Sequence, residues 1–266
     1  MLSVNNLTGF GHPRRAAGGG AAVTQQDIID LNCERFYSLN DLANDVWQEA
    51  AKTNPADADT DPIALIEDLS GNASNAVQTD VSSPDYRPLL DIDGSINSFV
   101  LTGTASANEH LSVSLNVTTD QADCSLFMTV KTTDTKGILF NSTNNNYFCG
   151  CLDDGNTGAT INSYASPVSG NETYVDGTLV TNNRDAFHTA VADGNWHVVE
   201  CTHANFEAGI VWTLADTGFY AGGGGYELAG NLSDIVIINE AALVAGDGRV
   251  ANTATIMSWL NAQVGL

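Results

Sequence analysis

Residues 111 to 120 read LSVSLNVTTD, and their strict alternation decides the fold class. Leu111, Val113, Leu115 and Val117 fall on one face of an extended chain, and the polar residues between them fall on the other. A period of two predicts a β-strand that is buried on one face only, as in an antiparallel sheet.

The same pattern recurs along the chain. Further predicted strands are SLFMTVK at 125–131, GILFNS at 137–142, NYFCGCL at 146–152, HVVECTH at 197–203, GIVWTLA at 209–215 and SDIVIIN at 233–239. Turns rich in Asn, Asp and Gly separate these strands, and Asp176-Gly177 has the form of a two-residue hairpin turn. So many short strands without intervening helices predict an all-β chain, folded as a two-sheet antiparallel β-sandwich of the jelly-roll type.

Only the ends of this β region show other patterns. The stretch SLNDLANDVWQEAA has helical spacing, which predicts a short surface helix near residues 39–51, and residues 25–32 are predicted to begin a strand. The last 15 residues, NTATIMSWLNAQVGL, predict a C-terminal helix whose apolar face packs on the sandwich.

The chain carries a large excess of negative charge. Nine Lys and Arg stand against 32 Asp and Glu, which gives a formal net charge of −23. Such a chain is repelled by nucleic acid and by anionic membranes, so we expect neither as a partner. No apolar run reaches the length of about 18 residues that a membrane-spanning helix needs, so no membrane insertion is expected.

Two domains follow from composition. Residues 1–24 form an N-terminal arm in which Leu2, Leu7 and Phe10 precede Arg14, Arg15 and a run of three glycines. Its arginines follow the apolar residues, the reverse of an export signal, so we expect the arm to be retained. An arm of this kind is suited to docking on a neighbouring subunit, whereas residues 25–266 form the β body.

The cysteines and sequons give weaker signals. Five cysteines match no zinc spacing, and buried reduced thiols are expected, with Cys149 and Cys151 on one face of a strand. Six N-x-S/T sequons, including those at Asn141 and Asn231, are interpreted as Asn-rich turns rather than as glycosylation sites.

A series of landmarks runs through the β body. Residues 61–103 contain the turn DLSGN, the stretch NAVQ, the pair Arg87-Pro88 and an apolar segment that ends at Gly103. These are followed by TYVDGTLV at 173–180, DGNWHVVE at 193–200, YELAGNLSDIVIIN at 226–239 and the closing IMSWLNAQVGL.

In this order the landmarks resemble the concanavalin A-like, laminin-G-type jelly-roll domains of phage and bacterial surface proteins, over about residues 35–266. The resemblance implies a two-sheet sandwich in which DLSGN forms the turn into an early strand. Glucanases share this superfamily, but the Glu-x-Asp-x-x-Glu text that supplies their paired carboxylates is absent, so we expect no enzymatic activity.

Binding is therefore the expected activity. Tyr147, Tyr164 and Tyr174 lie near Asn-rich turns and are the candidates for stacking on a sugar ring. Calcium is the one cofactor that the sequence indicates, and its candidate ligands are Asp153, Asp154 and Asn156; solvated acidic loops are the alternative.

The resemblance implies a non-enzymatic structural protein of a tailed phage, located on the virion surface as a capsid decoration, head fibre or tail accessory. Its expected partners are other virion proteins, bound through the arm, and host-surface polysaccharide, and homo-oligomerisation is expected. Two alternatives remain open: a secreted bacterial lectin and a diverged glycoside hydrolase.

Overall fold

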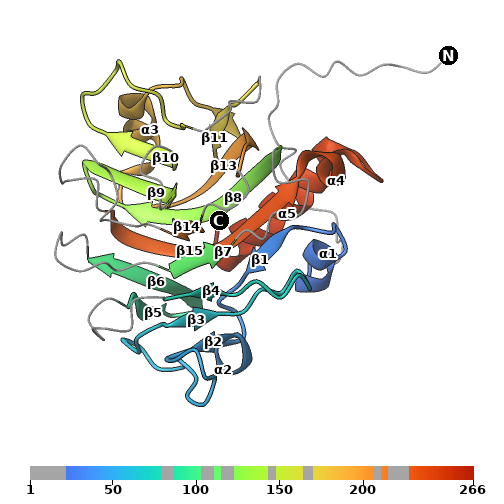
Figure 1. The fold of residues 1–266 in the computed structure, drawn as a ribbon. Coiled ribbons are helices and arrows are strands. Elements are labelled where there is room, and N and C mark those ends of the chain that lie inside the picture. The colour runs from blue at the N-terminus through green and yellow to red at the C-terminus, as the bar shows by residue number, and fades with distance from the viewer. Residues whose placement is uncertain are drawn as a thin grey trace.

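The computed structural model describes residues 22–78, 87–102, 111–114, 123–142, 148–163, 170–206, 211–214 and 228–266. The predicted attachment residues of the arm, Leu2, Leu7, Phe10, Arg14 and Arg15, lie outside these ranges. The described part is mostly β, with two large antiparallel sheets, an arrangement compatible with the predicted β-sandwich (Figure 1).

Sheet 1 has eight strands. Its order is β12 (Thr178–Leu179), β11 (Thr173–Val175), β13 (Trp196–Ala204), β8 (Cys124–Thr132), β15 (Ala229–Asn239), β6 (Ile96–Thr102) and β5 (Leu89–Asp93). The eighth strand, β1 (Arg35–Tyr37), pairs with the second half of β15, whereas β6 pairs with the first half. The strands β6 and β1 therefore follow one another along the same edge of β15.

Sheet 2 has seven strands, and helices complete the fold. The strand order is β10 (Phe148–Asp153), β9 (Lys136–Ser142), β14 (Val211–Leu214), β7 (Leu111–Ser114), β4 (Ala76–Val77), β3 (Leu65–Ile66) and β2 (Val46–Trp47). The helices are α1 (Gln25–Ile29), α2 (Leu42–Asp45), α3 (Arg184–Val191), α4 (Glu240–Val244) and α5 (Arg249–Gln263). None of the described helices is both long and apolar enough to cross a lipid bilayer.

The main core lies between the two sheets. On β15, Ile235 and Ile237 join a buried cluster that also contains Phe140 and Ile66 of sheet 2. Alternate residues of each strand point to opposite faces. The face of sheet 1 that carries Ile235 is therefore its inner face, turned toward sheet 2.

A second core lies on the outer face of sheet 1. There Val236 and Ile238, the residues that alternate with the inner pair, form a buried cluster with side chains of α1, α4 and α5. The α5 residues in this cluster are Ile256, Met257, Trp259 and Leu260, and the ring of Trp259 meets Phe36 of β1 edge-on at a centroid distance of 6.0 Å. Helix α5 thus packs its apolar face on the sheet, as the sequence predicts.

The DLSGN turn connects the two sheets. Buried Asp68 accepts hydrogen bonds from the backbone N–H of Phe36 at 3.1 Å, of Ser70 at 3.0 Å and of Ser74 at 3.1 Å. Asp68 also lies 4.0 Å from the Nε of Arg35. Because Phe36 belongs to β1 of sheet 1 and the turn joins β3 to β4 of sheet 2, this carboxylate fixes the sheets to each other. The stretch has a structural role.

The predicted helix near residues 39–51 is largely wrong. Only the single turn of α2 is helical, and β2 begins directly after it. Val46 is completely buried, pairs with Ile66 of β3, and accepts a hydrogen bond from the N–H of Ala56 at 2.9 Å. Pairing of a β-branched residue with a neighbouring strand overrides a weak local helix pattern.

Two further predictions need correction. The segment predicted to begin a strand at residue 25 is helix α1, because Thr24 and Asp27 form a capping box with reciprocal hydrogen bonds. The β region is also interrupted by α3, which begins at the N-cap Asn183 and buries Phe187 and Val191, four residues apart on one helix face.

Candidate functional site

Tyr174 is the only one of the three predicted sugar-binding tyrosines within the described residues; Tyr147 and Tyr164 lie outside them. It lies in β11 on the outer face of sheet 1, between its cross-strand partners Leu179 and Glu200. Its hydroxyl donates to Glu172 at 2.5 Å, and burial, followed by this bond, raises the pKa of Tyr174 well above its usual value. The half-buried ring therefore stands beside Leu179, which is 55% exposed.

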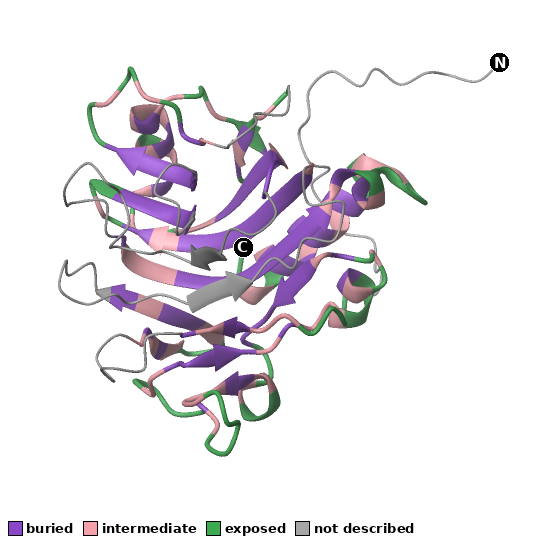
Figure 2. Ribbon diagram, in the orientation of Figure 1, coloured by how far each residue is buried: buried purple, intermediate pink, exposed green. Residues whose placement is uncertain are grey.

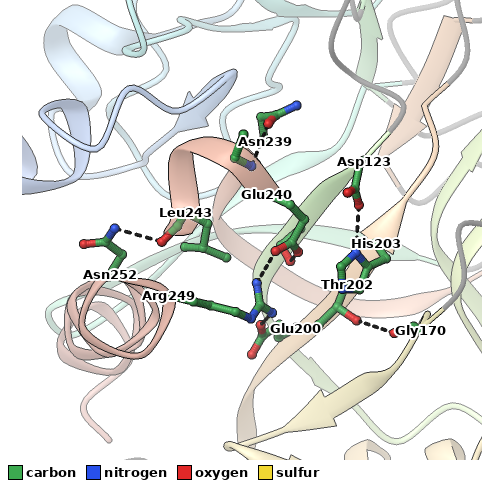
Figure 3. A network of polar contacts seen from close by, with 12 residues as sticks. Asp123, Gly170, Glu200, Thr202, His203, Asn239, Glu240, Leu243, Arg249 and Asn252 are labelled. Atoms are coloured by element: carbon green, nitrogen blue, oxygen red, sulfur yellow. Dashed lines mark hydrogen bonds and ion pairs between the residues drawn. The ribbon is translucent and has the colours of Figure 1, made fainter. Parts of the chain in front are cut away.

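Next to Tyr174, an arginine bridges two buried carboxylates (Figure 3). Arg249, the first residue of α5, donates through Nη2 to Glu200 of β13 at 2.7 Å and through Nη1 to Glu240 of α4 at 2.5 Å. Glu240 also accepts a hydrogen bond from Ser125 of β8 at 2.5 Å. These bonds attach both C-terminal helices to the central strands of sheet 1.

The charges in this cluster are incompletely balanced. The side chains of Glu200 and Glu240 are 5% and 7% exposed, so most of their hydration is lost. Burial raises the pKa of Glu200 to about 7; Arg249 lowers it, and the nearby carboxylates of Glu240 and Glu172 raise it further. One guanidinium thus holds two carboxylates, a geometry that favours anchoring over acid–base chemistry.

Polar contacts continue along β13 (Figure 3). The hydroxyl of Thr202 accepts from the N–H of Glu172 at 3.0 Å and lies 3.3 Å from the carbonyl oxygen of Gly170. His203 follows at a break in register, with a φ of +50°, and its Nδ1 lies 2.8 Å from Asp123. This bulge turns the imidazole toward the loop before β8.

His197 is held between two aspartates. Its Nδ1 lies 2.8 Å from Asp176, in the β11–β12 turn, and its Nε2 lies 2.9 Å from Asp193, in the turn before β13. A neutral imidazole has one N–H only, so satisfying both contacts requires the imidazolium. The hydrogen bond to Asp176, assisted by Asp193, accordingly raises the pKa of His197 above its usual value.

The predicted calcium ligands lie together at the end of β10, with Asp153 as its last residue and Asp154 and Asn156 in the turn that follows. Asp153 accepts from Asn156 Nδ2 at 2.9 Å and lies 3.4 Å from the Nζ of Lys136, whereas Asp154 lies 3.8 Å from the imidazole of His188 in α3. Each carboxylate therefore already has a polar partner within the protein. Across the ranges that the structure describes, no group of three or more His, Cys, Asp or Glu side chains is arranged to hold a metal ion. Calcium binding stays a prediction.

All five cysteines lie in the described ranges, where they are buried and form no disulfide. Cys149 joins the main core, whereas Cys151 packs with Ile138 and Phe148, because Gly150 between them adopts a φ of +66°. The two thiols therefore do not share one face as predicted. Burial raises the pKa of Cys151 to about 12, so its thiol stays protonated and unreactive at neutral pH.

Comparison with known proteins does not assign the chain to a family. No protein-family model matches the chain, and no curated protein matches it either. The functional assignment therefore rests on the residues of this chain and on the resemblance in their order.

Sequence reasoning placed Tyr174 among the candidates but did not find the arginine-bridged carboxylates beside it. Glu200 is the one acidic residue of the apolar segment HVVECTH, and a charged residue in a central strand is the signal that was available. Its partner Arg249 follows 49 positions later, and no local pattern connects the two.

Proposed function

We propose that this chain is a non-enzymatic structural protein of a tailed phage, exposed on the virion surface, with a lectin-like β body that binds host-surface glycans. The proposal takes the finer fold to be a concanavalin A-like jelly roll. It is supported by the two large antiparallel sheets with a shared core and by the ordered landmarks of the sequence.

The bridge formed by Arg249 is the observation that carries the non-enzymatic part. Retaining hydrolysis requires two carboxyl groups about 5 Å apart, one of them free to protonate a leaving group and the other free to attack. In this chain, Glu200 and Glu240 share one guanidinium, and both side chains are buried. Their geometry supports an anchoring role.

The attachment part rests on the N-terminal arm. Two adjacent arginines in a chain of net charge −23, preceded by large apolar residues, suit docking on another virion protein or on a second copy of this chain. Many copies on one particle increase the avidity of a weak sugar site without any new contact.

A glycan array with the purified protein, combined with a reducing-sugar assay, tests the binding proposal. Binding without release of sugar is the expected result, and the assay is run with calcium and with a chelator. Released sugar contradicts the proposal in favour of a diverged glycoside hydrolase.

Deleting residues 1–20 tests the attachment proposal. Loss of incorporation into particles, with an unchanged circular-dichroism spectrum, is expected. Normal incorporation of the truncated chain contradicts the attachment role of the arm.

A further inference from the structure

The helices cover only part of the outer face of sheet 1. In Figure 2, β15 is purple beside α5 and pink at its first residues, in agreement with the three half-buried positions that begin this strand. The uncovered part carries a polar row across five adjacent strands, β13, β8, β15, β6 and β5. Its members, in that order, are Trp196, Lys131, Asn231, Ser98 and Asp91, of which Ser98 is buried and the other four are partly exposed.

Strand register places the polar row on one face. Trp196 pairs with Lys131, and Lys131 pairs with Asn231. Lys131 lies four residues after Phe127, a member of the helix-covered core, so it shares the outer face. On β6, Asn231 pairs with Val100, and its amide reaches diagonally to Ser98, two residues away along that strand, and to Asp91, the cross-strand partner of Ser98.

One end of the row is a preorganised polar cluster. The Nδ2 of Asn231 donates to Asp91 at 2.7 Å and lies 2.9 Å from the hydroxyl of Ser98, which lies 3.2 Å from Asp91. These contacts leave one side-chain oxygen of Asn231 and one of Asp91 without a hydrogen-bond donor among the described residues. A fixed amide oxygen beside a fixed carboxylate oxygen is a geometry that accepts hydrogen bonds from hydroxyl groups.

The other end of the row presents an aromatic ring. The Nζ of Lys131 lies 6.0 Å from the centre of the Trp196 ring, and Lys131 forms no ion pair with a described carboxylate. A cation at this distance, on a half-exposed ring, contributes about 0.5 kcal/mol. A ligand that covers the ring face therefore displaces the ammonium at little cost.

Charge and size restrict the ligand. The row contains one positive and one negative side chain, Lys131 and Asp91, so it is locally neutral in a chain of net charge −23. A neutral ligand matches this balance, whereas a polyanion meets the repulsion of the whole chain. Four strand spacings of about 4.8 Å separate the two ends, so the row spans about 19 Å, more than a single sugar ring.

We propose that the polar row binds a neutral linear oligosaccharide that lies across the strands, with one sugar ring on Trp196 and hydroxyl groups of another sugar on Asn231 and Asp91. This inference rests on the proposed glycan binding and deepens it by naming the site and the ligand class. It also places the site on the uncovered end of the sheet instead of at Tyr174.

Isothermal titration of the full-length protein tests the ligand class. The probes are neutral linear oligomers of glucose, galactose, mannose or xylose, each with two to six units, and oligogalacturonates of the same lengths as acidic counterparts. We expect one neutral series to bind, with an affinity that rises with length until the oligomer spans about 19 Å. Oligogalacturonates are expected to bind at least about tenfold more weakly.

Substitutions then test the site. Trp196→Ala is expected to weaken binding by about tenfold or more and Asp91→Asn by about tenfold, whereas Trp196→Phe retains most of the affinity because the ring remains. Tyr174→Ala, an aromatic truncation on the same face beside Glu200 of the Arg249 bridge, is the matched control and is expected to keep the affinity within about twofold. Circular dichroism and the thermal midpoint show whether each variant is folded.

Each other outcome is decisive. If an oligomer binds but only Tyr174→Ala loses affinity, the polar row is not the site and the proposed glycan binding stands. Tighter binding of the acidic series overturns the neutral ligand class. If no oligomer and no glycan on the array binds, the polar row has no sugar ligand, and the glycan-binding part of the proposed function fails with it.

Discussion

The two parts of the outer face of sheet 1 are made by the same strands and yet carry different residues. Where α5 covers the sheet, outward positions hold Phe127, Val198 and Val236, and where it does not, they hold Lys131, Trp196 and Asn231. The change from the covered to the uncovered set of residues occurs within four residues along β8 and within two along β13. Alternation sets which residues face outward, and the neighbouring helices favour apolar side chains at those positions, except at Ser125 and Glu200, whose polar groups are hydrogen-bonded to Glu240 and Arg249.

Removing a large side chain from the covered part is expected to have the greatest effect. Phe127→Ala leaves a cavity between β8 and the helices and should lower the free energy of unfolding by about 3–5 kcal/mol. Urea denaturation measures this change. A loss below about 1 kcal/mol would mean that the helix layer does not pack tightly on the sheet.

The second-largest effect is expected at the ion bridge that Arg249 forms with Glu200 and Glu240. Arg249→Met leaves Glu200 and Glu240 buried without their cation, and we expect about 3 kcal/mol of destabilisation at pH 7 or above. The loss should shrink as the pH falls below about 7, because burial raises the pKa of Glu200 to about 7 and a protonated glutamic acid needs no counter-charge. Adding Glu200→Gln and Glu240→Gln to this variant is the control and should restore most of the stability.

The uncovered part should tolerate the equivalent truncation. Trp196→Ala removes a half-buried ring that is not part of the cluster packed under the described helices, so the expected loss in free energy of unfolding is only about 1 kcal/mol. The ratio of this loss to that of Phe127→Ala, measured in one urea series, expresses the contrast directly. Equal losses would contradict the division of the face into two parts.

The smallest expected effect concerns His197, next to Trp196. Because its folded pKa is raised above about 6.5, the imidazolium contact contributes fully below that pH and is lost as the pH rises through the folded pKa. Its two aspartate partners are about half exposed, so the contribution is about 0.2–1 kcal/mol per contact.

His197→Gln should therefore differ from the wild type most at pH 6 and least at pH 9, as measured by the thermal midpoint. Glu200, whose pKa of about 7 lies in the same range, titrates in both proteins. Its contribution therefore cancels in the difference between the thermal midpoints of the variant and the wild type. A difference that grows with pH would show that the imidazole is neutral in the folded protein.

Local chemistry predicted the turns well. The Asp176-Gly177 hairpin is confirmed, with φ values of +50° and +75° at the two turn residues and with Tyr174 paired to Leu179. Such a turn depends on two neighbouring residues, one of them glycine, so the sequence alone contains its cause.

Contacts between residues far apart in the chain could not be predicted from the sequence. Asn231 and Asp91 lie 140 positions apart, and nothing local shows that β15 and β5 flank β6 in one sheet. The sequon at Asn231 was interpreted as a turn, whereas it lies inside a strand, as does the one at Asn141. Short motifs fail when strand pairing decides the conformation of their residues.

The shared edge of β15 constrains the order in which the strands of sheet 1 can pair during folding. Phe36 of β1 pairs with Val236, so β1 cannot pair with β15 until a segment 200 residues further along the chain has been translated. Until β15 leaves the ribosome, β1, β6 and β8 lack the strand that joins them, and their unpaired edges are open to association with other nascent chains. We therefore expect folding to be slow and to finish after translation, and a chaperone that shields those edges should raise the yield of native protein.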